Sequence, residues 1–349
     1  MVRAGIFIGV NKTGNLQTLR DAASGAQRMH AWALSQGMTD GTHAKLITDT
    51  RYEKVHPDLI YDAIKELTDG PGVDQLFVYF AGHGVNINRS EQWLLTDAPV
   101  RTSAAVNVSG SVELARYCGI GHVVIISDAC RVAPEGIQAQ NVRGVDIFPN
   151  DAAGDRAKPV DQFYACVLGR TAAEIKDPAL AASSFSAVYT NAVLDALSGA
   201  RPDVLDASAT AGDDALYVRP VKLQAYLERD VPARVRDMGL AAKVNQNPDA
   251  ILTVHSNWLA RLKPRAVHAT RDRQSIAPAR SPDTLRTVSD RLLCSAIEDG
   301  RKELNRELWK AKLVNVPGAE QLAGSVEQIA TPWSGSLRNA MWCQGVPSD

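Results

Sequence analysis

Cys130 and His83 have side chains that together can perform nucleophilic catalysis, and each comes shortly after an apolar run of residues. Cys130 follows a β-branched run at residues 123–126, and His83 follows an apolar run at residues 76–80. Each run predicts a buried parallel strand, and ligands of open α/β sheets bind at the carboxyl ends of such strands. Because an imidazole next to a thiol favours the reactive thiolate, the two residues predict thiol chemistry at that edge of the sheet.

Each of the two residues also has an ordinary structural explanation. A buried Cys is common as a small hydrophobic residue, and a His between two glycines is common in turns that bind nothing. Residues 81–84 predict such a tight turn directly after the strand. The matched positions at two strand ends favour the catalytic interpretation, because the chain between them is long enough for one crossover between neighbouring parallel strands.

The segments Ala-Gly-His-Gly at residues 81–84 and Asp-Ala-Cys-Arg at residues 128–131 resemble the caspase-like cysteine peptidases, which include caspases, metacaspases and bacterial orthocaspases. The caspase signature is Q-A-C-[RQG]-G, with a His about 50 residues upstream. This chain departs from it at Asp128 and Val132, and Arg131 and Val132 also depart from the metacaspase pattern D-x-C-H-S-G. The resemblance extends over roughly residues 3–260.

The resemblance implies a fold and an activity. The fold would be a caspase-like α/β/α sandwich with a mostly parallel central sheet, followed by a small C-terminal helical extension. The activity would be that of a cysteine endopeptidase acting on proteins, with His83 and Cys130 as its catalytic dyad. The backbone N–H groups of Gly84 and Cys130 would form the oxyanion hole, where one donor is worth about 3 kcal/mol. Bacterial relatives of this kind are often linked to regulated cell death or defence.

Two acidic residues, Asp21 and Asp128, stand where the resemblance implies the pocket for the residue before the scissile bond. Two carboxylates in one pocket would attract Arg or Lys and reject an acidic side chain, as in metacaspases. Each Asp has a structural alternative. Asp21 is placed to cap the helix that it begins, and Asp128 is placed to cap backbone N–H groups at a strand end.

A preference for basic residues would make exposed basic segments of the chain sites of self-cleavage. The candidates are Arg143, Arg156 and Lys158, in a Gly-, Pro- and Asp-rich loop expected at residues 133–159, and the arginines between residues 265 and 286.

We expect no cofactor and no metal site, since no Cys/His spacing is typical of zinc. Calcium activation, which occurs in parts of the metacaspase group, is left open by Asp146, Asp151 and Asp155 in one loop. Their spacing matches no EF-hand, and acids in a loop are commonly just solvated.

The rest of the pattern predicts the alternating strands and helices of a doubly wound sheet. Further strands are expected at residues 4–10, 44–48 and 162–168, and helices at residues 19–33, 57–67, 111–117, 183–197, 221–238 and 283–312. Residues 246–252 resemble the distal part of bacterial caspase-like domains.

A chain of 349 residues with 45% hydrophobic content is sufficient for one large domain and a small appendage, or for two domains. We expect a peptidase domain at residues 1–262. Residues 263–349 would form a basic linker and a helical C-terminal extension, which is a candidate binding site for an upstream activator or regulator.

The net charge of -1 gives no reason to expect nucleic acid or an anionic membrane as a partner. Five cysteines without a C-x-x-C pair fit a reducing compartment. No apolar run reaches 18 residues, and the apolar run near the start is too short for a secretory signal. We therefore expect a soluble cytoplasmic protein.

Two other functions are compatible with these observations. A caspase-like scaffold or receptor would use the fold for binding alone, although the presence of both His83 and Cys130 argues against it. An enzyme with the same dyad and another chemistry, such as acyl transfer, would be separated from a peptidase by assays with peptides and small thioesters.

Overall fold

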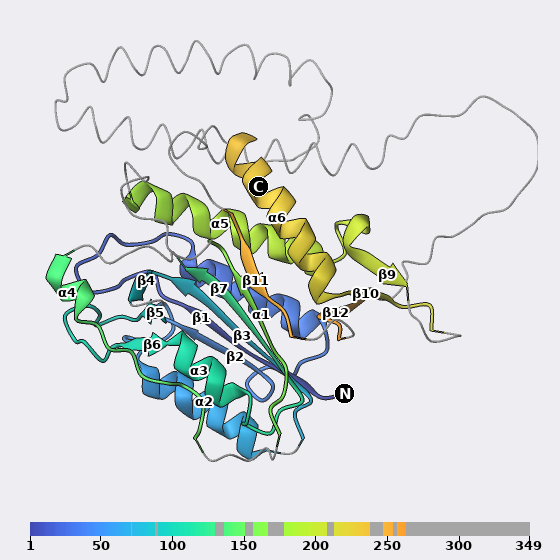
Figure 1. Ribbon diagram of the computed structural model, residues 1–349, viewed down its shortest axis with the longest axis horizontal. Helices are drawn as coiled ribbons and strands as arrows, with labels where there is room; N and C mark the ends of the chain where they lie inside the picture. The colour runs from blue at the N-terminus through green and yellow to red at the C-terminus, as the bar shows by residue number, and fades with distance from the viewer. Residues whose placement is uncertain are drawn as a thin grey trace, which may run out of the picture. The chain divides into compact units, whose positions relative to one another are not determined.

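A computed structural model of the chain describes residues 1–70, 72–87, 90–129, 136–150, 156–166, 178–207, 213–237, 247–253 and 257–262. At its centre lies a six-stranded sheet with the order β11-β8-β7-β3-β1-β2 (Figure 1). The strands are β1 (Arg3–Gly9), β2 (Ala44–Thr48), β3 (Gln75–Gly82), β7 (His122–Ala129), β8 (Val160–Tyr164) and β11 (Asp249–Ile251). All neighbours in this sheet are parallel except β8 and β11. The prediction of an α/β fold with a mostly parallel central sheet is confirmed, whereas the expected extension at residues 263–349 lies outside the described residues.

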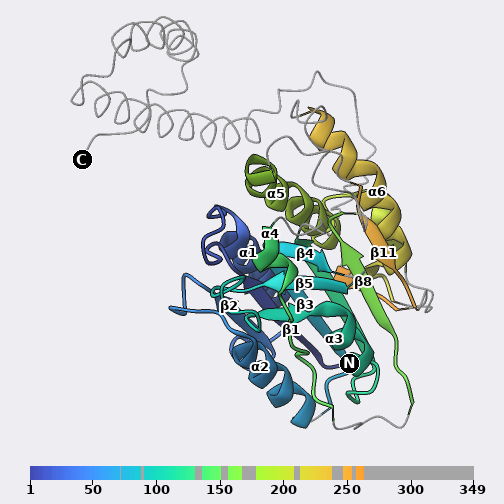
Figure 2. The ribbon, with the colours of Figure 1, turned by 60° about the vertical axis from the view of Figure 1, so that its left-hand side comes forward.

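Helices cover both faces of the sheet (Figures 1 and 2). One face carries α1 (Ala22–Ser35), α5 (Pro178–Leu197) and α6 (Pro220–Asp237), and the other carries α2 (Pro57–Asp69) and α3 (Val108–Ala115). The central strands bury side chains on both faces: in β7, Val124 and Ile126 face α1 and α5, while Val123 and Ile125 face α2 and α3. Continuous apolar runs therefore marked these strands in the sequence. Among the described helices, none is long and apolar enough to cross a membrane.

The chain passes from β3 directly into a second, three-stranded antiparallel sheet. Its strands are β4 (Gly84–Ile87), β5 (Ser90–Leu94) and β6 (Ala105–Asn107). The prediction of a tight turn at residues 81–84 is wrong. The pairing of β3 with β7 continues as far as Gly82, and the pairing of β4 with β5 already starts at Gly84. His83 is the single residue between the two sheets.

Three other segments differ from the expected elements. Helix α3 begins at Val108 rather than at residue 111, because the side chain of Asn107 accepts a hydrogen bond from the N–H of Gly110 at 3.3 Å. A five-residue helix, α4 (Gly136–Gln140), lies within the expected loop at residues 133–159 and is too short to show a helical period in the sequence. A third small sheet comprises β9 (Leu205–Ala207), β10 (Leu216–Val218) and β12 (Ala260–Leu262).

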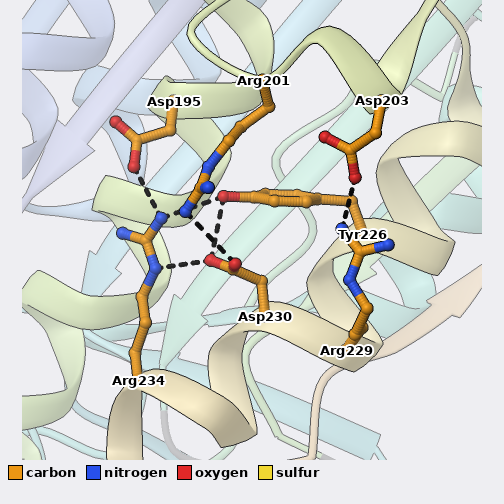
Figure 3. A network of polar contacts seen from close by, with 7 residues as sticks. All are labelled: Asp195, Arg201, Asp203, Tyr226, Arg229, Asp230 and Arg234. Atoms are coloured by element: carbon orange, nitrogen blue, oxygen red, sulfur yellow. Dashed lines mark hydrogen bonds and ion pairs between the residues drawn. The ribbon is translucent and has the colours of Figure 1, made fainter. Parts of the chain in front are cut away.

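A polar network attaches α6 to α5 (Figure 3). Arg234 of α6 binds Asp195 of α5 at 2.6 Å and also Asp230 of its own helix. Tyr226 donates a hydrogen bond to Asp230 and accepts one from Arg234, both at 2.9 Å. Arg201, just beyond α5, binds Asp230 at 3.3 Å and lies over the ring of Tyr226. A network of this kind contributes more than isolated surface ion pairs, so it fixes the C-terminal half of α5.

A second network is buried at the amino ends of the parallel strands. Arg3 of β1 donates to the side-chain oxygen of Gln75 in β3 at 2.8 Å, and Gln75 contacts Nδ1 of His122 in β7 at 2.9 Å. Nε2 of His122 lies 3.0 Å from Asp161 of β8, which also accepts two hydrogen bonds from Thr253. Four adjacent strands are thereby joined by side chains.

The directions of these hydrogen bonds follow from Arg3, whose guanidinium can only donate. The oxygen of Gln75 therefore faces Arg3, and its NH₂ group donates to the carbonyl of Trp258 and to Nδ1 of His122. Nδ1 accepts, so Nε2 carries the proton and donates to Asp161. Both ring nitrogens of the buried His122 thus have hydrogen-bond partners.

We predict that Asp161 makes stability depend on pH in the acid range. Burial acts to raise the pKa of Asp161, but hydrogen bonds from His122 and Thr253 outweigh burial and hold this pKa below its ordinary value. The resulting stabilisation is present above about pH 4 and is lost as the pH falls through the lowered pKa. Asp161→Asn should reduce the free energy of unfolding at pH 7 by about 1–3 kcal/mol. Urea denaturation at pH 7 and below pH 4 should show a smaller acid loss in Asp161→Asn than in the parent.

The matched control for this measurement is Asp69→Asn. Asp69 pairs with Lys65 on the exposed surface of α2 at 2.9 Å, so its replacement should change the free energy of unfolding by about 0.5 kcal/mol or less. Equal effects of the two substitutions would contradict the importance of the buried network.

Candidate active site

His83 stands where β3 ends, half-buried, with one ring nitrogen fixed. Its Nε2 lies 2.7 Å from the backbone carbonyl of Gln17. A carbonyl oxygen only accepts, so Nε2 carries a proton, and Nδ1 is the nitrogen available to exchange a proton with a reacting group. Burial lowers the pKa of His83, and the bond to Gln17 only partly offsets this effect. The imidazole is therefore oriented and kept neutral at physiological pH.

The pairing of β3 with β7 brings two strand ends side by side. Phe80 pairs with Ser127, Ala81 with Asp128 and Gly82 with Ala129, which is the last pair of the ladder. The residue after β3 is His83, and the residue after β7 is Cys130, which lies outside the described residues. The two strands thus end at the same edge of the sheet.

Below these strand ends, polar side chains join the small antiparallel sheet to β7. Glu91 of β5 accepts hydrogen bonds from Ser127 at 2.6 Å and from the indole N–H of Trp93 at 2.9 Å. Trp93 also contacts the Ser127 hydroxyl at 2.9 Å, and its ring stacks on Phe80 with centroids 4.7 Å apart. Since Phe80 and Ser127 are paired residues, this cluster holds both strands close to their ends. Sequence reasoning missed Glu91, because an isolated acid in a polar pentapeptide gives no signal of burial.

The backbone N–H of Gly84 points away from the β4–β5 ladder. The N–H of Leu94 donates to the carbonyl of His83 at 2.9 Å, and hydrogen-bonded pairs alternate with non-hydrogen-bonded pairs along an antiparallel ladder. Gly84 pairs with Trp93 at the following, non-hydrogen-bonded position. This ladder therefore does not use the N–H of Gly84, which adjoins His83.

Asp21 immediately precedes α1, yet its side chain makes no capping hydrogen bond. The side-chain oxygen of Asn11 instead accepts from the N–H of Ala23 at 3.0 Å, in the first turn of the helix. The capping explanation for Asp21 is therefore wrong. Its carboxylate is partly exposed beside the face of the sheet that α1 covers.

Asp128 lies on the same face of the sheet, near the carboxyl end of β7. It is 3% exposed, and it accepts a hydrogen bond from the hydroxyl of Thr190 in α5. Its neighbours on this face include Tyr79 and Ala81 of β3. The structure thus brings Asp21 and Asp128 to one side of the sheet, one at the start of α1 and the other beneath α5.

The other candidate residues are spread over different segments. Arg143 donates to the carbonyls of Gln140 and Val142, and the Arg156 side chain is exposed. Asp146 accepts a hydrogen bond from Asn107 at 2.9 Å, whereas Asp151 and Asp155 lie outside the described residues. No group of three potential metal-ligating side chains occurs in the part of the chain that the structure describes.

The chain is similar to a known protein family and to solved structures. The family model described as the caspase domain matches residues 5–214. Among solved structures, caspase-1 from Spodoptera frugiperda has 11% identity and a TM-score of 0.45, covering 74% of this chain and 88% of its own. A protein from Geobacter sulfurreducens has 12% identity and a TM-score of 0.41, covering 72% of this chain and 93% of its own. No curated protein sequence matches the chain.

We predict that the imidazole of His83 titrates below pH 6.5, because burial disfavours its charged form. The chemical shifts of the ring protons, followed by NMR over pH 4.5 to 8, measure this pKa directly, and loss of the signals in His83→Ala assigns them. A pKa for His83 above about 6.5, the ordinary value for histidine, would contradict the burial argument.

Proposed function

Because this chain belongs to the caspase domain family, which is a family of cysteine peptidases, we propose that it is an endopeptidase with Cys130 as nucleophile and His83 as acid and base. The observation that carries this proposal is the β3–β7 register, whose last pair, Gly82 and Ala129, immediately precedes His83 and Cys130. The contact of His83 with Gln17 supports it, since it leaves Nδ1 for the reaction.

The proposed reaction divides peptide hydrolysis into two steps. Nδ1 of His83 takes the thiol proton of Cys130 as sulfur attacks the scissile carbonyl carbon, and the N–H groups of Gly84 and Cys130 stabilise the oxyanion. The imidazolium then protonates the leaving amine, and an acyl-enzyme remains. Water, deprotonated by His83, attacks the thioester, and the thiol leaves with the proton. Atoms and charge balance, and the dyad returns to its starting state.

We propose that the residue before the scissile bond is Arg or Lys. A basic side chain would enter between Asp21 at the start of α1 and Asp128 at the end of β7. The absence of a capping bond from Asp21 supports this role, because a carboxylate not used by its own helix can bind a ligand. The burial of Asp128 supports it as well, since a cation interacts more strongly with a desolvated carboxylate.

We also propose that the enzyme processes itself. The candidate sites are Arg143, Arg156 and Lys158, and the arginines between residues 265 and 286. Protein substrates follow from the peptidase family, whereas calcium activation, action in the cytoplasm, a regulator bound to residues 263–349 and a role in bacterial defence or cell death are further proposals.

Replacement of either dyad residue should abolish peptidase activity. Cys130→Ala and His83→Ala should lose cleavage of a peptide library and all self-cleavage, while circular dichroism stays unchanged, because both residues follow the core strands. Cys166→Ala is the matched control, since this partly buried thiol in another segment should be dispensable. Measurable cleavage by purified Cys130→Ala would show that the nucleophile is another residue.

The acidic pocket should be separable from the dyad. Asp128→Asn should reduce kcat/KM for arginyl and lysyl peptides by tens- to thousands-fold, because losing one desolvated charge partner costs about 2–5 kcal/mol. Alkylation of Cys130 by a small reagent should continue at the parental rate. Asp21→Asn should act in the same direction, and the double variant should lose less than the sum of the two effects. A parent enzyme that prefers Asp before the cleaved bond would refute the pocket.

A further inference from the structure

Three buried side chains form a directed series of hydrogen bonds that ends on Asp128. The hydroxyl of Tyr79 in β3 lies 2.6 Å from the hydroxyl of Thr190 in α5, and Thr190 donates a hydrogen bond to Asp128 in β7. An ionised carboxylate can only accept, so the single hydroxyl proton of Thr190 goes to Asp128. Tyr79 must therefore donate to Thr190. The series runs from Tyr79 through Thr190 to Asp128.

Tyr79 can serve as the donor at any physiological pH. Burial, and then the negative charge of Asp128, raise the pKa of Tyr79 well above its ordinary value, so the phenol stays protonated. Tyr79 and Thr190 are both fully buried, so water does not compete for their hydroxyl groups. Successive hydrogen bonds in such surroundings strengthen one another.

The same hydroxyls lie against the first turn of α1, close to Asp21. A Cβ atom added to Gly25 would lie 3.0 Å from the Tyr79 hydroxyl and 3.6 Å from Thr190. The N–H of Gly25 donates to the carbonyl of Asp21 at 2.7 Å, so Asp21 stands one helical turn before this contact. The hydroxyl pair therefore lies between the strand that carries Asp128 and the helix end that carries Asp21.

Helix α5 fixes the position of Thr190 over the sheet. Five residues further along, Asp195 is bound by Arg234 of α6 in the network of Figure 3. Tyr189, next to Thr190, provides a contrast, because its hydroxyl is fully buried and has no hydrogen-bond partner among the described residues.

We propose that Thr190, supported by Tyr79, is a positioning residue that fixes the carboxylate of Asp128 for binding the basic side chain of the substrate. This inference rests on the proposed function. A carboxylate that binds a guanidinium or ammonium group must hold its orientation while substrates enter and leave, and a hydrogen bond from a rigid helix provides that restraint. Loss of the Thr190 hydroxyl should weaken substrate binding more than the chemistry at Cys130.

The test uses two replacements of Thr190 and one of its neighbour in the full-length protein. Thr190→Val keeps the shape and removes the hydroxyl, and Thr190→Ser keeps the hydroxyl. Tyr189→Phe removes a buried hydroxyl that has no hydrogen-bond partner in the described parts of the chain. KM and kcat are measured with arginyl and lysyl peptides. The rate of Cys130 alkylation by iodoacetamide, located by mass spectrometry, reports on the thiol alone.

Thr190→Val should lower kcat/KM by about 10- to 100-fold, the equivalent of one hydrogen bond to a charged group, mainly through KM. Its alkylation rate should match the parent, Thr190→Ser should recover most of the loss, and Tyr189→Phe should behave as the parent. If Thr190→Val does not fold, Tyr79→Phe removes only the donor to Thr190 and should raise KM in the same direction.

Three results would overturn the inference alone: parental kinetics in Thr190→Val, an equal loss in Thr190→Ser, or an equal loss in Tyr189→Phe. Each would show that the hydroxyl of Thr190 does not position Asp128. A parent that cleaves no arginyl or lysyl peptide would overturn the proposed specificity, and this inference with it.

Discussion

The parallel pairing of β3 with β7 is the constraint on which the rest of the structure depends. Both strands are fully buried, so neither can slide by one residue without moving its apolar side chains to the wrong faces. Their ladder extends from Gln75 and His122 at one end to Gly82 and Ala129 at the other. The register therefore determines which residues meet at each end of the sheet.

The two ends of this ladder carry histidines with opposite properties. His122 is paired on both ring nitrogens, with Gln75 and Asp161, and belongs to a closed network that joins four strands. His83 uses Nε2 for the Gln17 carbonyl, which leaves Nδ1 for the chemistry proposed at this edge. Strand position alone does not distinguish these roles. What distinguishes them is the number of polar partners that other strands supply.

The same difference explains which parts of the structure could be predicted from the sequence. The buried parallel strands and amphipathic helices were predictable, because their apolar residues recur with a period or in a continuous run. Strand β5 was not, because Glu91 and Gln92 are polar but buried through hydrogen bonds to residues far away in the sequence. The prediction that Asp21 caps α1 failed for a similar reason. The side chain of Asn11, from an earlier segment, accepts the hydrogen bond from the N–H of Ala23.

The candidate site shows this limit most clearly. His83 and Cys130 could be singled out because each follows an apolar run and has a recognisable local motif. Thr190 has no motif, and its contact with Asp128 exists only because α5 packs across the ends of β3 and β7. Residues that support a site from a packed helix are visible only after the layers of the fold are assembled.

The partners of the two buried carboxylates also separate two kinds of pH dependence. Hydrogen bonds from His122 and Thr253 hold the pKa of Asp161 below its ordinary value, so the amino end of the sheet responds to acid through Asp161 itself. Asp128 is held by Thr190, which does not ionise, and behind it by Tyr79, whose pKa burial and the charge of Asp128 raise well above its ordinary value. These two contacts of Asp128 therefore stay constant across neutral pH. Under the proposed mechanism, a change in cleavage rate near neutrality that leaves them intact would report the imidazole of His83 and the thiol of Cys130.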